Sequence, residues 1–424
     1  MTVLVAGKVN ISKLMADFKM QNSEGAATLM QQEINDISYV VGNENTLKAM
    51  PDVPAMRIFD DKSITFLNAL STLLMKKAKD YSDVITFAFW CRRVSLLKEK
   101  NKYDDIFERF GKGVVFHSTP SNVPVNFAFS FAAGLLAGNS NIIRLPAKDF
   151  PQVSVICDAI NELVSGDFSY IQPYVLMAKF PTVRAILDSL SVIADARVIW
   201  GGDQTIANIR QSAMKPRANE ITFSDRHSIL IINADFYLSA DDKERIVQNF
   251  YNDTYFSDQN ACTSPAFVFW LGSNIEAAKA DFWGKVESKS IRDYHLSPVQ
   301  VVGKLSKSYQ IAANSDVKII KNRSNHLTRV ELKELDHHII NYKYNSGFFL
   351  EYSIQDIREI LPICSEKCQT VTYLGLNKKD FDVFISSSPK GVDRIVPMGK
   401  SMDFSLVWDG HDLIRELSRK ITFQ

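Results

Sequence analysis

One cysteine stands in a polar stretch where its thiol could do covalent chemistry. Residues 258–265, DQNACTSP, place Cys262 after a helix-like segment and directly before the apolar run AFVFWLG. A thiolate in such a loop is a competent nucleophile toward an acyl group. A buried cysteine also serves as a small hydrophobic side chain, and this stretch alone leaves both interpretations open.

An asparagine lies between two prolines in the stretch HSTPSNVPVNF. Pro120 and Pro124 stiffen the loop around Asn122, so its amide could point in a fixed direction. An amide NH2 group is a suitable donor to the oxyanion that develops during acyl transfer. The alternative is that Asn122 caps the helix predicted to begin near Pro124.

Two further loops carry groups that suit a nucleotide. Arg144 and Lys148 flank the end of the apolar run NIIRL, where basic side chains could hold a phosphate or a ribose; otherwise they are solvated surface charges. Gly201 and Gly202 lie between the run ARVIW and a helical pattern. A glycine turn allows close backbone approach, and a helix N-terminus can hold phosphate. Asp203 could be no more than the cap of that helix.

The elements that must position these loops alternate between strands and helices. From residue 113 the chain runs through GVVFHS, PVNFAFSFAAGLLA, NIIRL, PQVSVICDAINELV, a further helix-like segment, ARVIW, DQTIANIRQSA, SILIIN, a helix near 240–253, and AFVFWLG. This alternation predicts a doubly wound, parallel α/β sheet, in which ligands bind beyond the carboxyl ends of the strands. From about residue 26 to 100 the pattern is helical, with Ile64, Leu67, Leu70 and Leu74 three or four residues apart.

Composition excludes several classes of protein. The 424 residues are 46% hydrophobic and 23% charged. Their net charge of +1 gives no excess of positive charge for binding nucleic acid or an anionic membrane. The first residues lack the pattern of a signal peptide, and VNFAFSFAAGLLAG is too short to span a bilayer. We therefore expect a cytoplasmic protein without a membrane span.

The cysteines and histidines suggest neither a disulfide framework nor a metal site. The cysteine count of five is odd, and Cys364 and Cys368 are separated by three residues with no histidine at ligand spacing. Cys91 is interpreted as a core residue. His337 and His338 are interpreted as a helix end or a surface pair.

The order of these motifs resembles that of the aldehyde dehydrogenase superfamily. GVVFHSTPSNVPVNFAFSFAAGLLAGNSNIIRLPAKDFP resembles its proline-bracketed asparagine and basic strand end, VIWGGDQTI its glycine turn, and DQNACTSP its nucleophile loop. The chain is more similar still to one branch, the acyl-CoA reductases typified by the fatty acid reductase of bacterial luminescence. CQTVTYLGL, QNACTSP and the ending RIVPMGKSMDFSLVWDGHDLIRELSRK carry this closer resemblance, which covers roughly residues 100 to 424.

The resemblance implies an aldehyde dehydrogenase-like α/β fold with two doubly wound parallel-sheet domains behind a helical N-terminal lead-in. The expected divisions are a lead-in over residues 1–50, an NADP(H)-binding domain over 51–225, and a catalytic domain with the nucleophilic cysteine over 226–395. A C-terminal segment over 396–424 is expected to pack back on the first domain.

The resemblance also implies a reaction. Cys262 would attack an acyl thioester to give a thioacyl-enzyme, with its own backbone N–H and the amide of Asn122 stabilising the oxyanion, and NADPH would then deliver hydride to release the aldehyde. The substrate would be an acyl-CoA or a carrier-bound acyl group, with an acyl-activating synthetase as a partner and a homo-oligomer as the assembly. Cofactor contacts are expected from Thr119, Pro120, Ser121, Arg144, Lys148, Gly201, Gly202 and Asp203.

Three positions qualify this expectation. Phe223 falls about where hydrolytic relatives place a glutamate, so a thioacyl-enzyme would hydrolyse slowly for want of a general base. Glu220, three residues earlier, is the alternative base. Glu351 could hold the nicotinamide ribose, although an ordinary strand-end charge is the favoured interpretation. The alternative functions are reduction of a short activated acid and a catalytically silent scaffold.

Overall fold

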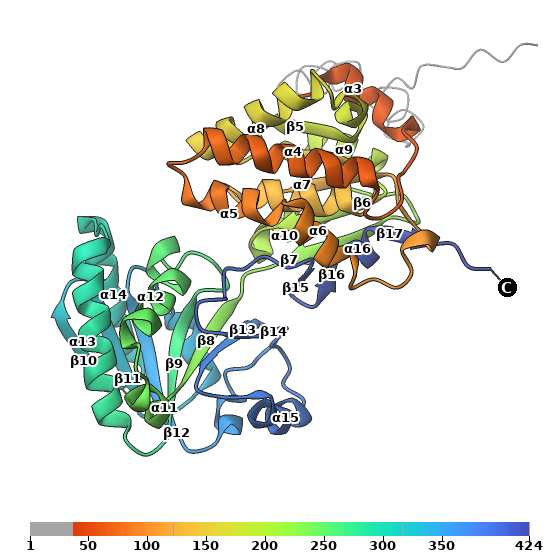
Figure 1. Cartoon of the computed structure of the whole chain (residues 1–424). Coiled ribbons are helices and arrows are strands. Elements are labelled where there is room, and N and C mark those ends of the chain that lie inside the picture. The colour runs from red at the N-terminus through yellow and green to blue at the C-terminus, as the bar shows by residue number, and fades with distance from the viewer. Residues whose placement is uncertain (1–36, 122, 316, 424) are drawn as a thin grey trace, which may run out of the picture. The chain divides into compact units, whose positions relative to one another are not determined.

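The computed structural model describes residues 37–423 apart from 122 and 316, and the chain forms two compact units (Figure 1). Unit 1 comprises the residues up to Ser224 together with those from His411 onward, and unit 2 runs from Asp225 to Gly410. Each unit contains one large sheet. The segment 396–424 is therefore divided: residues 411–424 belong to unit 1 and residues 396–410 to unit 2.

Unit 1 is built on a six-stranded sheet with the order β1-β5-β4-β3-β6-β7. Only β1 is antiparallel to its neighbour, and the remaining described pairs are parallel. The strands β3 and β6 are buried along their whole length, as a strand covered by helices on both faces must be. The strands are β1 (Ser38–Val41), β3 (Val114–Ser118), β4 (Ser140–Arg144), β5 (Val175–Lys179), β6 (Ala196–Trp200) and β7 (Asn219–Phe223).

Helices cover both faces of this sheet. Buried side chains of α3 (Glu44–Ala49), α9 (Arg184–Ile193) and α10 (Asp203–Arg210) pack on one face. On the other face lie α7 (Asn126–Leu136) and α8 (Pro151–Val164), with α4 (Asp61–Lys77) packed on them (Figure 1). The spacing that predicted α4 is confirmed, because Ile64, Leu67, Leu70 and Leu74 are all fully buried.

Three predictions for unit 1 were incomplete. The helical pattern before residue 100 contains the strand β1, and the segment taken as helical before ARVIW contains β5. The pattern after α4 is also interrupted, because α5 (Ser82–Trp90) ends and α6 (Arg93–Lys100) begins around Arg92, whose backbone is extended. The side-chain oxygen of Asn68 accepts a hydrogen bond from the Arg93 amide at 2.9 Å, which satisfies a donor exposed by that break. Cys91 is buried there, as expected.

Unit 2 is built on a seven-stranded sheet with the order β10-β11-β12-β9-β8-β13-β14, in which β10 is antiparallel and the others are parallel. The strands are β8 (His227–Asn233), β9 (Pro265–Leu271), β10 (Val317–Ser324), β11 (Leu327–Leu332), β12 (Phe348–Ile354), β13 (Cys368–Leu374) and β14 (Arg394–Pro397).

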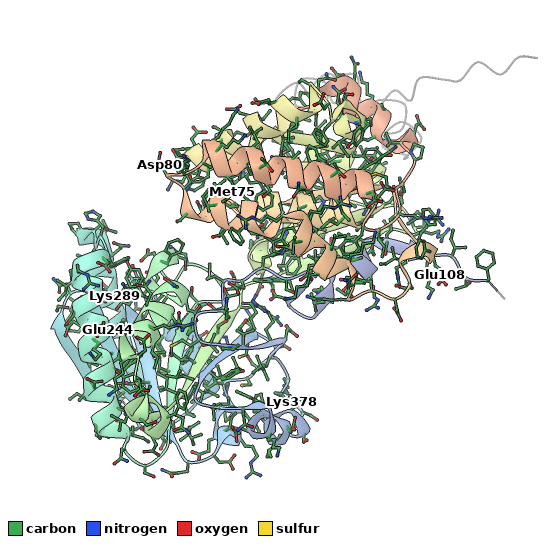
Figure 2. The ribbon with its side chains drawn as sticks, in the orientation of Figure 1. Met75, Asp80, Glu108, Glu244, Lys289 and Lys378 are labelled. Carbon is green, nitrogen blue, oxygen red and sulfur yellow. The ribbon has the colours of Figure 1, made fainter. Side chains whose placement is uncertain are left out.

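The two faces of this sheet also carry separate cores. Helices α11 (Ala234–Ser239), α12 (Lys243–Asp253) and α13 (Ile275–Asp293) pack against one face. The turns η5 (His337–Tyr342) and η6 (Ile357–Ile360), the helix α15 (Lys378–Ser386), and Ile311 from α14 (Pro298–Asn314) pack against the other. Polar side chains such as Glu244 on α12 and Lys378 on α15 point outward and are exposed (Figure 2).

Short elements complete the described chain: η1 (Met50–Asp52), η2 (Ile106–Glu108), β2 (Arg109–Gly111), η3 (Ser169–Tyr174), η4 (Tyr255–Ser257), β15 (Val407–Trp408), β16 (His411–Asp412), α16 (Leu413–Glu416) and β17 (Ser418–Lys420). In unit 1, β17 pairs with β2 in antiparallel register. Among the residues described, no helix is long and apolar enough to cross a bilayer.

Candidate functional site

Cys262 lies in a short loop between η4 and β9 in unit 2. Its side chain is exposed, whereas those of the other four cysteines are buried. The interpretation of Cys262 as a small core residue is therefore wrong. Of the five thiols, this one is open to an external acyl group.

A pair of residues on the N-terminal side of Cys262 has a backbone conformation that non-glycine residues rarely adopt. Asp258 and Gln259 both have φ +53°, in the left-handed region that costs a non-glycine residue roughly 1 kcal/mol or more. The Gln259 amide offsets this cost by bonding to the backbone: its oxygen accepts from the amides of Gly347 (2.7 Å) and Phe348 (3.2 Å). Its nitrogen donates to the carbonyls of Pro265 (3.2 Å) and Phe348 (3.3 Å). The loop is thus fastened to the first residues of β9 and β12.

Asp258 anchors the same loop to α14 and to the turn before β12. Its carboxylate accepts hydrogen bonds from the hydroxyls of Tyr294 and Ser346, the latter at 2.8 Å, and from the Gln300 amide at 2.9 Å. Nearer the thiol, the Ser228 hydroxyl donates to the carbonyl of Cys262 at 2.6 Å. These contacts hold the backbone on both sides of Cys262, which favours a reproducible position for the thiol.

The surroundings of Cys262 do not activate its thiol at neutral pH. Burial of the sulfur among protein atoms raises the pKa of Cys262 above its ordinary value, although part of the residue stays exposed. The backbone N–H of Arg226 and the charge of Lys343 lower the pKa, while the carboxylates of Asp409 and Asp225 raise it. The thiol form therefore predominates at pH 7, so acylation should accelerate as the pH rises.

The glycine turn lies at the carboxyl edge of the unit 1 sheet. Gly201 follows β6 and donates its backbone N–H to the carbonyl of Phe223, at the end of β7, at 3.1 Å. Gly202 is the N-cap of α10 and has no side chain with which to cap that helix. Asp203 is the first helical residue, so its interpretation as the cap is wrong. α10 thus begins at a glycine turn, the kind of helix start whose backbone can closely approach an anion.

The other expected cofactor residues of unit 1 follow neighbouring strands at the same edge. The Thr119 hydroxyl donates to the carbonyl of Arg144 at 2.6 Å, which links the ends of β3 and β4. The Arg144 guanidinium donates to the Phe180 carbonyl (3.2 Å) and to the Thr182 hydroxyl (2.7 Å), so part of its donor capacity is already used. Lys148 is exposed beside the Phe150 ring, Pro120 is half-buried and Ser121 is exposed. Asn122 lies outside the described residues.

Glu220 and Phe223 occupy different ends of β7. Glu220 pairs in register with Arg197 and accepts from its guanidinium at 2.8 Å and from that of Arg210 at 2.6 Å. Phe223 lies at the carboxyl end and stacks on Trp200, with ring centroids 3.7 Å apart and planes 16° from parallel. Three residues of a strand rise about 10 Å, so Glu220 is remote from the edge where ligands bind. The geometry favours Phe223 as the residue at that edge.

Glu351 has neither of the expected roles. It is the fourth of the seven residues of β12 and its side chain is fully buried. It pairs with Arg329 at 2.6 Å and accepts from the indoles of Trp270 (3.2 Å) and Trp283 (3.0 Å). A carboxylate so enclosed supports the core of unit 2 and cannot reach a ribose.

Within the described part of the chain, one group of side chains could approach a metal ion. The ligand atoms of Asp336, His337 and His338, at the start of η5, lie within 4.8 Å of one another, and all three residues are exposed. Their exposure agrees with the interpretation of the histidines as a surface pair. Cys364 and Cys368 are buried, and Cys368 is the first residue of β13.

Sequence reasoning missed the residues that support the site. Gln259 and Asp258 immediately precede the cysteine, and a polar Asp-Gln-Asn run before a candidate nucleophile was the available signal. Ser228 and Trp200 gave no comparable signal, because each lies in an apolar strand pattern.

Comparisons with known proteins extend this description. The family model described as "Acyl-CoA reductase (LuxC)" matches residues 32–420. The long-chain acyl-protein thioester reductase of Vibrio harveyi is 25% identical over 334 residues, and that of Aliivibrio fischeri is 23% identical over 327. Each match covers 74% of this chain but only 64% and 63% of the relatives.

Solved structures of low sequence identity share the fold. Aldehyde dehydrogenase 21 from Physcomitrella patens superposes with a TM-score of 0.63 at 12% identity, covering 88% of this chain and 87% of that one. Lactaldehyde dehydrogenase from Escherichia coli gives 0.62 at 12% identity, covering 89% and 90%. The expected aldehyde dehydrogenase-like α/β fold is confirmed.

Proposed function

Because this chain belongs to the LuxC family of acyl-CoA reductases, we propose that it reduces an acyl thioester to an aldehyde through a thioacyl-enzyme on Cys262. The observation that carries the proposal is the exposed thiol in a loop whose backbone is fastened at Asp258, Gln259 and the Cys262 carbonyl. A matching nicotinamide cofactor is expected at the carboxyl edge of the unit 1 sheet. Unit 1 is thus proposed as the nucleotide-binding domain and unit 2 as the catalytic domain.

Acyl transfer is the first step. The Cys262 thiolate attacks the thioester carbonyl, a sulfur–carbon bond forms, and the carrier thiolate leaves with the electron pair of the bond that breaks. The Arg226 N–H stabilises the thiolate. The backbone N–H of Cys262 and the amide of Asn122 are the proposed donors to the oxyanion of the tetrahedral intermediate.

The residues of unit 1 suit the cofactor that this fold implies. The glycine turn at the start of α10 is proposed to let the helix N-terminus approach a pyrophosphate, and Thr119, Pro120, Ser121 and Lys148 lie on adjoining loops. When bound, the nicotinamide would supply the hydride that reduces the thioacyl carbonyl carbon. The carbon–sulfur bond to Cys262 then breaks, the aldehyde leaves and the Cys262 thiolate keeps the electron pair. We propose NADPH over NADH, with Arg144 and exposed Lys148 toward the 2′-phosphate.

The acyl group is proposed to be long and to arrive on CoA or on a carrier protein. This rests on the names of the relatives, which are long-chain acyl-protein thioester reductases. An acyl-activating synthetase would supply such a donor and is the proposed partner, and a homo-oligomer is the proposed assembly.

Two variants test the residue roles. Cys262→Ser should abolish aldehyde formation from an acyl-CoA and NADPH while nucleotide affinity is retained, since a hydroxyl is a far weaker nucleophile than a thiolate. Asn122→Ala should lower kcat by about 10²–10³ with an unchanged melting temperature. A loss of about 1 kcal/mol of stability with unchanged kcat would instead identify Asn122 as a helix cap. Normal turnover by Cys262→Ser would overturn the proposed function.

A further inference from the structure

We propose that Trp200 is a positioning residue for the Gly201–Gly202 turn, held in place by a buried chain of hydrogen bonds through Ser130, His117 and Asn141. The inference deepens the proposed function and rests on it, because it assumes that the turn receives the nicotinamide cofactor. Trp200 itself is buried against protein and is not proposed to touch the substrate.

The indole is fixed on its face by a parallel aromatic stack. Trp200 and Phe223 are the last residues of the neighbouring strands β6 and β7, and they pair in register. Their ring centroids lie 3.7 Å apart, and the His411 ring forms a T-shaped pair with Phe223 at 5.6 Å between centroids. Both aromatic residues are more than nine-tenths buried. The Gly201 N–H bonds to the Phe223 carbonyl, so the stack and the start of the turn share one backbone contact.

The indole is fixed at its edge by hydrogen bonds whose directions can be assigned. Trp200 Nε1 donates to the Ser130 hydroxyl at 3.0 Å. Ser130 in turn contacts His117 Nδ1 at 2.8 Å, and His117 Nε2 contacts Asn141 Oδ1 at 3.1 Å. The Asn141 oxygen can only accept, so Nε2 carries the proton, Nδ1 accepts from Ser130, and every bond in the chain has one donor and one acceptor. Burial lowers the pKa of His117 to about 4, which keeps the imidazole neutral at physiological pH.

Gly134 leaves the space that the hydrogen-bonded side chains of His117 and Asn141 occupy. This glycine lies in the interior of α7, where glycine is less favourable than alanine by roughly 0.5–1 kcal/mol. A Cβ atom there would lie 1.9 Å from Asn141 Oδ1 and 3.0 Å from His117 Nε2. The glycine therefore allows the two polar side chains to meet beneath the helix, which is an observation independent of the stack.

This series of hydrogen bonds joins the strands that lead to the proposed cofactor loops. His117 on β3 precedes Thr119 by two residues, Asn141 on β4 precedes Arg144 by three, and Trp200 on β6 directly precedes Gly201. Loss of the indole would free the Phe223 ring and the end of β6. The directions of the amides at the start of α10 would then vary, which weakens binding of a pyrophosphate that needs them aligned.

The test measures NADPH binding by calorimetry in Trp200→Ala, Trp200→Phe and Ser130→Ala. We expect the Kd to rise about tenfold in Trp200→Ala and less in the other two, which keep either a ring or the indole. Trp90→Ala is the matched control, because Trp90 is another unit 1 tryptophan packed against a phenylalanine, Phe129. Its Kd should stay at the wild-type value.

The rate of Cys262 acylation without nucleotide distinguishes a failure of the proposed function from a failure of the role of Trp200. Acylation should proceed at the wild-type rate in Trp200→Ala. If wild-type protein neither binds NADPH nor forms an acyl adduct, the proposed function fails; if it does both and folded Trp200→Ala binds NADPH equally well, only the role of Trp200 fails. If Trp200→Ala does not fold, the wild-type protein can be labelled with 5-fluorotryptophan. The resonance that is missing from the spectrum of Trp200→Phe belongs to Trp200, and it should shift when NADPH is added. A Trp200 resonance that does not move would overturn the inference.

Discussion

The loop that carries Cys262 should be sensitive to the loss of a single amide, that of Gln259. This side chain makes four hydrogen bonds to backbone groups of Pro265, Gly347 and Phe348. Gln259→Ala removes all four and keeps the left-handed backbone at φ +53°. Gln259→Gly removes the same bonds but relieves the backbone strain.

The magnitude follows from these contacts. Each hydrogen bond contributes about 0.5–1.5 kcal/mol net, and water replaces part of the loss because Gln259 is half-buried. We therefore expect Gln259→Ala to lower the free energy of unfolding of unit 2 by about 2–4 kcal/mol. Gln259→Gly should be less destabilised than Gln259→Ala by roughly 1 kcal/mol, the cost of the left-handed conformation.

Urea unfolding followed by circular dichroism measures the stability, and the rate of adduct formation on Cys262 measures the geometry of the loop. Gln248→Ala is the control, because Gln248 is exposed on α12 and its amide donates to Asn252 on the same helix. That variant should stay within about 0.5 kcal/mol of wild type. If Gln259→Ala did the same and acylated at the wild-type rate, the anchoring described for this loop would be wrong.

Three further predictions concern single groups. Glu220→Gln should lower the free energy of unfolding of unit 1 by about 1–3 kcal/mol, because it leaves the buried Arg197 guanidinium without its carboxylate. The lifetime of the acyl-enzyme should equal that of wild type, and a clear gain in that lifetime would identify Glu220 as a base. The pKa of His117 is about 4 in the folded chain, whereas its ordinary value is 6.5, so between these pH values the unfolded state binds one more proton. The free energy of unfolding should therefore fall as the pH drops from about 6.5 to about 4, by up to about 3 kcal/mol. His117→Gln should flatten that dependence in melting experiments, and an unchanged slope would contradict the assignment. Alkylation of Cys262 by iodoacetamide should quicken about tenfold per pH unit through neutral pH, and Asp409→Asn should accelerate it at pH 7; a plateau below pH 8 would show that the pKa is not raised.

Much of the fold could be predicted because its strands are continuous apolar runs. ARVIW and PQVSVICDAINELV match β6 and α8 residue for residue, since burial on both faces of a sheet and a proline at the first turn leave strong patterns. β1 could not be predicted, because it is a four-residue edge strand of mixed burial. β5 has the strand-like run VLMAK, but the turn η3 with an internal proline precedes it and obscured its start.

The candidate site could be proposed from the sequence only where its residues lie close together in the chain. Cys262 and the glycine turn each lie in one short motif, and the order of motifs supplied the rest. Gln259 and Trp200 were not predicted, because their partners Phe348 and Ser130 are 89 and 70 residues away. Glu351 was misinterpreted for the same reason: only the fold brings Arg329 and two indoles around its carboxylate. Side-chain networks of this kind depend on tertiary contacts that a single sequence does not display.

The central claim is that Cys262 carries an acyl group that awaits hydride and is not hydrolysed. It is tested most directly by intact-mass measurement after incubating the full chain with a long-chain acyl-CoA and no nucleotide. Phe223 ends β7, and we propose that it stands where hydrolytic relatives place their general base. Because such a base is typically worth about 10²–10⁴ in rate, we predict an acyl adduct on Cys262 that persists. Adding NADPH should discharge it as the aldehyde. An adduct that disappears without NADPH and yields the free acid, or no adduct on Cys262 at all, would contradict the account.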